Sequence, residues 1–148
     1  MNNDDLPNKG SYCLIIYVEK DCKIKIGAKG FMNFPEGYYV YVGSALSNLT
    51  KRIERHLSSD KKKHWHMDYF SLNKNVDIKQ VIYTFSTKKI ECEMSNHINK
   101  NTNKYIEDFG CSDCNCMSHL YYFDSFDEAE NVIIESFEKI ELKPMKWF

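Results

Sequence analysis

A basic helix follows a tyrosine-rich strand in the first third of the chain. Residues 39–43 read Tyr-Val-Tyr-Val-Gly, and the segment after them carries Arg52, Arg55 and His56 at positions i, i+3 and i+4. On a helix these three side chains share one face. A guanidinium binds two phosphate oxygens with its planar fork, and a histidine exchanges protons near neutral pH. The pattern therefore predicts a site for a phosphate group.

Two tyrosines in predicted neighbouring strands could act on such a phosphate. Tyr12 lies near the start of one strand, and Tyr41 lies two residues before Gly43 in another. Phenol groups on adjacent strands can meet at one point. A tyrosine with its usual pKa near ~10 needs a nearby cation to act as a base, and Arg52 offers one. Taken alone, each tyrosine is better explained by strand packing, but their register with Gly43 and Arg52 favours a site.

A second basic segment follows the predicted helix. It opens with three lysines that can bind backbone phosphates: Lys61, Lys62 and Lys63. Trp65 could stack on an exposed base, as in proteins that hold single strands. Because Trp65 and Tyr69 are spaced i and i+4, core packing is the better interpretation of the tryptophan. His64 and His66 could also reach the substrate, without an assigned role.

Composition and charge restrict the class of protein. The 148 residues are 43% hydrophobic and 14% aromatic, which excludes a disordered chain and fits one domain over 1–148. We expect a polar tail at 1–9 and a C-terminal helix and tail at 125–148. The net charge of −1 conceals a basic segment at 51–63 and an acidic one at 124–141, so the basic side could face a polyanion. Without a long apolar run, we expect no signal peptide or membrane anchor and a cytoplasmic location.

The elements that must position these residues alternate between strand and helix patterns. Strands are predicted at 11–18, 23–28, 38–43, 76–86 and 118–123, the first three as an antiparallel meander. Helices are predicted at 48–58, with Ser47 or Asn48 as the cap, at 88–101 and at 125–140. Residues 64–72 fit a helix or an extended segment. The expected fold is α+β, with a small, mostly antiparallel β-sheet flanked by helices.

Several of these segments resemble one nuclease superfamily. Gly-Ser-Tyr (10–12), Tyr-Val-Gly (41–43) and Lys-Arg-Ile-Glu-Arg-His (51–56) are similar to motifs of the GIY-YIG nucleases, which are named for the strand motifs Gly-Ile-Tyr and Tyr-Ile-Gly. The chain also resembles the small Uri-type endonucleases, and this resemblance extends from about Gly10 to about Phe123 of the chain. The further segments that carry it are 34–46, 64–70, 91–92 and 109–120. Ser11 replaces the motif isoleucine, which should change packing only. The Tyr12-to-Tyr41 spacing exceeds that of the homing enzymes, so an extra turn or strand must lie between.

The resemblance implies roles for individual residues in an endonuclease. Tyr12 or Tyr41 would contact or deprotonate the attacking water, Arg52 would bind the phosphate, and His56 would give acid–base help or a phosphate contact. Substrate contacts would come from these residues: Gly43, Ser44, Lys51, Arg55, Lys61, Lys62, Lys63, His64 and His66.

The same resemblance implies one divalent ion held by a single glutamate. This suits Mg²⁺, or Mn²⁺ in its place, because Mg²⁺ keeps most of its waters. Glu91 and Glu93 both flank the apolar stripe of the helix near residues 90–100. In the superfamily an apolar residue follows the glutamate by three positions. Glu91 has Met94 there and Glu93 has Asn96, so we assign the metal to Glu91.

A cysteine-rich segment offers a different chemistry. Residues with the ligand types of zinc are Cys111, Cys114, Cys116 and His119, and the easier tetrahedral set is Cys92, Cys114, Cys116 and His119. A packed loop of buried thiols is the stronger interpretation. A Cys114 or Cys116 nucleophile activated by His119, in a hydrolase or redox enzyme, is the weakest.

The sequence thus favours a metal-dependent endonuclease that acts on DNA with low sequence specificity. The first alternative is a nucleic-acid-binding module without turnover, and the second is a thiol- or zinc-dependent hydrolase. A role in DNA repair, a homodimer and a repair-protein partner are left open, as are the choice between DNA and RNA and the strand structure of the substrate.

Overall fold

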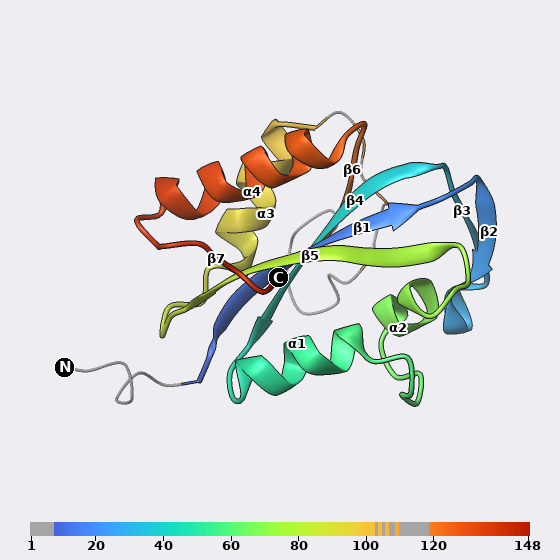
Figure 1. Ribbon diagram of the computed structural model, residues 1–148, viewed down its shortest axis with the longest axis horizontal. Coiled ribbons are helices and arrows are strands. Elements are labelled where there is room, and N and C mark those ends of the chain that lie inside the picture. The colour runs from blue at the N-terminus through green and yellow to red at the C-terminus, as the bar shows by residue number, and fades with distance from the viewer. Residues whose placement is uncertain (1–7, 103, 105, 107–108, 110–118) are drawn as a thin grey trace.

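A five-stranded antiparallel sheet forms the centre of the protein (Figure 1). The computed structural model describes residues 8–102, 104, 106, 109 and 119–148. The strand order is β6-β4-β1-β5-β7, so the first strand of the chain lies in the middle. The strands of this sheet are β1 (Gly10–Val18), β4 (Gly37–Ala45), β5 (Val76–Phe85), β6 (Leu120–Phe123) and β7 (Met145–Lys146).

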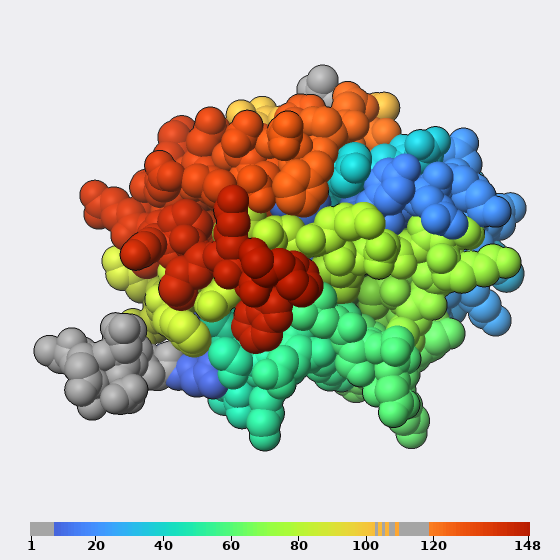
Figure 2. Space-filling view, viewed as in Figure 1, coloured from blue at the N-terminus to red at the C-terminus, as the bar shows by residue number. Residues whose placement is uncertain are grey.

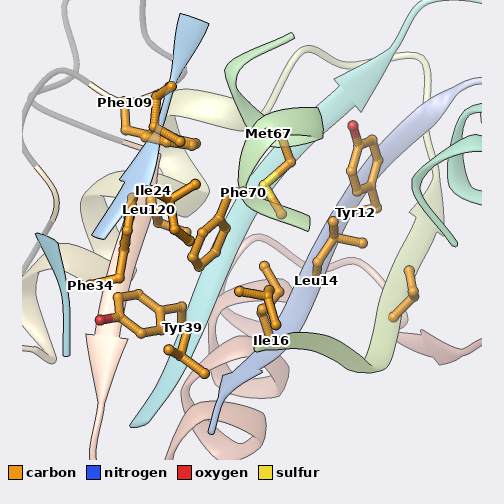
Figure 3. Close-up of a cluster of buried hydrophobic side chains, with 14 of the residues drawn as sticks. Tyr12, Leu14, Ile16, Ile24, Phe34, Tyr39, Met67, Phe70, Phe109 and Leu120 are labelled. Carbon is orange, nitrogen blue, oxygen red and sulfur yellow. The ribbon is translucent and has the colours of Figure 1, made fainter. Parts of the chain in front are cut away.

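The central strand β1 is buried on both faces, which explains its almost continuous apolar sequence. Tyr12, Leu14 and Ile16 point into one core cluster, shown in Figure 3. Cys13 and Ile15 point into a second cluster on the opposite face. This is the alternation that a β-strand imposes on successive side chains. The sheet therefore needs a helical layer on each side.

Two pairs of helices supply these layers (Figure 1). On the Tyr12 face lie α1 (Leu49–Leu57) and α2 (His66–Ser71); on the other lie α3 (Glu91–Lys100) and α4 (Phe126–Lys139). Figure 2 shows α4 packed along the sheet on the side away from α1. The Asn48 side chain accepts a hydrogen bond from the backbone N–H of Lys51 and starts α1.

The predicted meander of the first three strands is wrong in one respect. Strand β2 (Cys22–Lys25) pairs with β3 (Phe31–Phe34) in a separate two-stranded sheet, joined by a 3₁₀ turn at Gly27–Lys29, and does not pair with β1. Both edges of β1 are already taken, by β4 and by β5. The hairpin instead packs Ile24 and Phe34 into the Tyr12-side core. This hairpin is the extra element expected between Tyr12 and Tyr41.

The fold class is confirmed as α+β, with a mostly antiparallel sheet flanked by helices. The 64–72 segment, for which the sequence allowed two conformations, contains the helix α2. The short strand β7 was not predicted and pairs with β5 at the edge of the sheet. Within the described part of the chain, no helix combines the length and the apolar character needed to cross a bilayer.

Candidate active site

The candidate site lies where β4 runs beyond its partner β6. The two strands pair over Tyr38–Tyr41, with one further backbone bond from Val42 N–H to the His119 carbonyl. Past this point, residues from both faces of β4 reach one cavity of about 510 Å³. Of the predicted site residues, those lining it are Tyr12, Tyr41, Gly43, Ser44, Arg52, His64, His66 and Glu91. Four of the five predicted catalytic residues therefore line the cavity, and the fifth, His56, contacts Tyr12 without lining it.

Gly43 allows the phenol of Tyr12 to reach this cavity. The two residues are direct partners in the β1–β4 ladder. A Cβ atom at position 43 would overlap the Tyr12 ring and its hydroxyl. The glycine is thus required by a close approach of the ring, because any side chain here would push Tyr12 away from α1.

Tyr12 and His56 form a buried hydrogen-bonded pair. The Tyr12 hydroxyl lies 2.7 Å from Nε2 of His56, and both side chains are 2% exposed. Burial, with the neighbouring Tyr41, raises the pKa of Tyr12 well above its usual value, against the opposing charge of Arg52. Burial and the cation of Lys61 lower the pKa of His56 to about 3. Both groups are therefore neutral at neutral pH, and the Nδ1 atom of His56 has no hydrogen-bond partner in the described structure.

Tyr41 and Arg52 complete the Tyr12 side of the cavity. The Tyr41 ring packs edge-on to His56, and burial followed by the charge of Glu91 raises its pKa. The Arg52 guanidinium donates a hydrogen bond from Nη1 to the Ser44 carbonyl at 3.0 Å and lies 4.8 Å from the centre of the Trp65 ring. Arg52 is thus held between β4 and the segment that leads into α2.

Glu91 reaches the cavity from the opposite face of the sheet, at the first residue of α3. Its Oε2 accepts a hydrogen bond of 3.0 Å from the Ser44 hydroxyl, and its Oε1 lies 3.0 Å from Nδ1 of His119. Burial alone would raise the pKa of Glu91, but the contacts with His119 and Ser44 outweigh it and lower the pKa. Glu91 is therefore an ionised carboxylate at neutral pH. The alternative ligand, Glu93, is exposed and does not line the cavity.

The structure gives Arg55 and Lys61 partners within the protein. Arg55 forms two hydrogen bonds of 2.9 Å with the carboxylate of Asp68, which is fully buried. The Lys61 side chain is 4% exposed, and its ammonium donates to the carbonyls of Arg55 and His56 at the end of α1. Arg55 and Lys61 were predicted to contact substrate, whereas here they join α1 to the segment that follows. Lys51, Lys62 and Lys63 are exposed, as a phosphate contact requires.

Asp68 is a positioning residue that the sequence analysis did not single out. Besides Arg55, its carboxylate accepts hydrogen bonds from the backbone N–H groups of His64 and Trp65. Burial raises the pKa of Asp68, but these donors and Arg55 outweigh it and bring the pKa to about 2. The only available signal was an acidic residue three positions into a helix, which is typical of a capping residue. Here it holds His64 and Trp65 at the cavity wall.

The zinc prediction is only partly covered by the structure. Cys111, Cys114 and Cys116 lie outside the described residues. Cys92 is a thiol on α3, and His119 lies against Glu91. Among the described residues, no group of three or more histidine, cysteine or acidic side chains is placed to hold a metal ion. The sequence analysis considered His119 only as part of the cysteine segment. In the structure it lies beside Glu91, the predicted metal ligand.

Comparison with family models identifies the class of this chain. It belongs to the family described as "Domain of unknown function DUF123", whose model matches residues 11–142. The match includes both tyrosines, the basic helix, Glu91 and α4. Comparisons with curated proteins and with solved structures find no match.

Proposed function

We propose that this protein is a divalent-metal-dependent endonuclease of the GIY-YIG type that hydrolyses phosphodiester bonds in DNA. The observation that carries the proposal is that Tyr12, Tyr41, Arg52 and Glu91 line one cavity, with His56 hydrogen-bonded to Tyr12, and that these residues come from four different elements. A phenol, a neutral imidazole, a guanidinium and a carboxylate are the groups needed to move a proton and neutralise phosphoryl charge. Core packing alone would not bring ionisable groups to the same cavity.

The Tyr12–His56 pair supplies the acid–base step of this proposal. At neutral pH the imidazole is neutral and can accept a proton through the 2.7 Å contact with the phenol. A phosphodiester in the cavity brings a negative charge, which raises the pKa of a neighbouring histidine and makes this transfer easier. As the water oxygen bonds to phosphorus, Tyr12 takes the water proton and passes its own to Nε2 of His56. The bond between phosphorus and the leaving oxygen breaks, and the leaving alkoxide takes a proton from solvent. Tyr41 lies beside His56 and can hold the attacking water.

Arg52 and Glu91 act on the phosphate and its metal ion. The Arg52 guanidinium retains donors beyond the one used by Ser44, and these can bind two phosphate oxygens as negative charge grows on them. Glu91 is the ionised carboxylate that lines the cavity, and a single carboxylate fits Mg²⁺ or Mn²⁺. Such an ion, when bound, neutralises charge on the phosphoryl and leaving oxygens. Ser44 and His119 orient the carboxylate that would hold it.

A cleavage assay tests this proposal directly. Labelled single-stranded, duplex and branched DNA are incubated with the protein and Mg²⁺, Mn²⁺ or EDTA. We expect metal-dependent cutting that falls about 10²-fold or more in Arg52→Ala, since one donor to a developing oxyanion contributes that much. Glu91→Gln should lose the metal dependence as well as the rate.

Two matched variants serve as controls. Glu93→Gln changes the neighbouring acid of α3, and Glu54→Ala changes an exposed residue of α1; both should cut at the wild-type rate. If the wild type binds DNA but does not cut it with either metal ion, the protein is a binding module and the proposal fails. Equal loss in Glu93→Gln and Glu91→Gln would contradict the assignment of the metal ligand.

A further inference from the structure

The β2–β3 hairpin presents a second basic surface outside the cavity. Lys23 is paired with Asn33 across the two strands, and Lys25 with Phe31. All four side chains are exposed, because they alternate with the inward Ile24 and Phe34. We call these four residues the hairpin face. It combines two cations, an amide and an aromatic ring on one side of a two-stranded sheet.

The hairpin face places an exposed aromatic ring beside two lysines. Phe31 is 66% exposed, so its ring is accessible to a ligand, and covering it would remove apolar surface from water. No described carboxylate forms an ion pair with Lys23 or Lys25. The nearby Asp21 instead accepts a hydrogen bond from the backbone N–H of Glu36. Two unpaired ammonium groups beside an exposed ring match the phosphates and bases of a nucleic-acid strand.

Side-chain contacts connect this face with the candidate active site. Lys63 precedes the cavity residue His64, and its ammonium lies 5.2 Å from the centre of the Tyr69 ring. The same ring packs against Gly27, in the turn between β2 and β3. The exposed Lys63 therefore lies between the cavity and the hairpin, where it can continue a line of positive charge.

The aromatic core holds the hairpin at a fixed position relative to the cavity. Tyr41 contacts Phe109, Phe109 contacts Phe70, and Phe70 contacts Phe34 of β3, with ring centres 6.3, 6.2 and 4.6 Å apart. Figure 3 shows Phe34 and Ile24 at one end of this cluster and Tyr12 at the other. The hairpin is thus held at a fixed position relative to Tyr41 of the cavity.

We propose that the hairpin face binds a single-stranded segment of the substrate that flanks the cleaved bond. Lys23 and Lys25 contact its phosphates, Phe31 stacks on an unpaired base, and Asn33 can donate to a phosphate or a base edge. The segment is single-stranded because a base can cover Phe31 only when it is not stacked inside a duplex. This inference rests on the proposed endonuclease function and adds to it a preference for substrates with an unpaired strand.

Binding of labelled oligonucleotides tests the hairpin face without relying on cleavage. Fluorescence anisotropy is measured in EDTA with single strands of about 5 and about 20 nucleotides, since a single binding surface covers about 4–16. We expect Lys23→Gln/Lys25→Gln to weaken binding of the long strand about tenfold and to reduce its salt slope by about 1.4, or 0.7 for each lost phosphate contact. Phe31→Ala should weaken binding about fivefold or more at an unchanged salt slope. The strand of about 5 nucleotides should bind equally well to the wild type, to Lys23→Gln/Lys25→Gln and to Phe31→Ala.

A double variant on the other side of the sheet is the matched control. Lys100→Gln/Lys143→Gln removes the same charge from two exposed lysines at the end of α3 and after α4, and it should bind like the wild type. Circular dichroism confirms that each variant is folded. If the wild type binds the long strand and the hairpin variants bind it equally well, this inference is overturned while the endonuclease proposal stands. If the wild type binds neither single strand, this inference is overturned, and the endonuclease proposal is then decided by the metal-dependent cleavage assay on duplex and branched DNA.

Discussion

At the scale of single residues, the hydroxyl of Tyr12 is the most informative group to remove. Tyr12→Phe retains the ring over Gly43 but leaves Nε2 of His56 without its 2.7 Å partner. We expect the cleavage rate to fall about 10²-fold or more, because the proton path through the pair is lost. The free energy of unfolding should fall by only about 1–3 kcal/mol, the cost of one unsatisfied buried polar atom.

Rates from the cleavage assay and denaturant titrations measure these two effects separately. Tyr17→Phe, at the other end of β1, is the matched control. It should change neither the cleavage rate nor the free energy of unfolding. A Tyr12→Phe protein that is stable and fully active would show that the phenol only fills space.

His56 also predicts how stability depends on pH. Its pKa in the folded protein is about 3, below the usual value of about 6.5 in an unfolded chain, because of burial and the charge of Lys61. The unfolded state therefore binds the proton first, and folding stability is present above about pH 6.5 and is lost as the pH falls toward 3. Between about pH 7.5 and about pH 5 this linkage removes about 2 kcal/mol.

Urea titrations at these two pH values measure the change. In His56→Gln most of the pH dependence in this window should disappear, whatever the absolute stability of the variant. His64→Gln replaces an exposed histidine and should retain the wild-type dependence. Equal pH dependence in the wild type and in His56→Gln would mean that His56 is not held neutral by burial.

At the scale of elements, one buried carboxylate joins α1 to α2. Asp68 binds Arg55 and the backbone N–H groups of His64 and Trp65, and Lys61 lies 3.9 Å from it. Asp68→Asn removes the charge that balances two cations, which should lower the free energy of unfolding by about 3–5 kcal/mol. The segment between the helices should also open, so that trypsin cleaves after Lys62 or Lys63 faster than in the wild type.

Asp60→Asn is the control for this experiment, because Asp60 is an exposed acid in the same segment. It should be cleaved at the wild-type rate. If Asp68→Asn is as resistant to trypsin as the wild type, the segment is held by the packing of Trp65 alone.

The elements themselves were largely predictable, and the pairing between them was not. Helix α1 begins after Asn48 and α4 after Ser125, as local capping signals indicate. By contrast, the partner of β2 depends on which strands occupy the edges of β1, which no local pattern contains. Residue types and spacing indicated Tyr12 and Arg52, whereas Glu91 was indicated only by the resemblance to the GIY-YIG nucleases. The roles of Asp68 and His119 depend on contacts formed only after folding, so the sequence did not reveal them.

At the scale of the whole molecule, exposed basic and acidic residues are distributed unevenly over the two sides of the sheet. The α1–α2 side carries the cavity and the exposed Lys51, Lys62 and Lys63. The far side carries exposed acidic residues in and beside α4: Asp124, Asp127, Glu128, Glu135, Glu138 and Glu141. The far side also carries exposed lysines, among them Lys100 and Lys143, so attraction of a polyanion depends on the basic residues beside the cavity, despite a net charge of −1. DNA approaching the protein should meet the cavity side first.

This arrangement predicts how a duplex is cut. The described residues bring together one Tyr12–His56 pair, one Arg52 and one Glu91, so each chain offers a single candidate site to one strand at a time. On a supercoiled plasmid with Mg²⁺ we expect nicked circles to accumulate before linear DNA, at a rate proportional to protein concentration. Gel electrophoresis over a time course and a protein dilution series measures both. Glu91→Gln is the inactive control. Linear product without a nicked intermediate, at a rate rising with the square of protein concentration, would instead require two chains acting together on opposite strands.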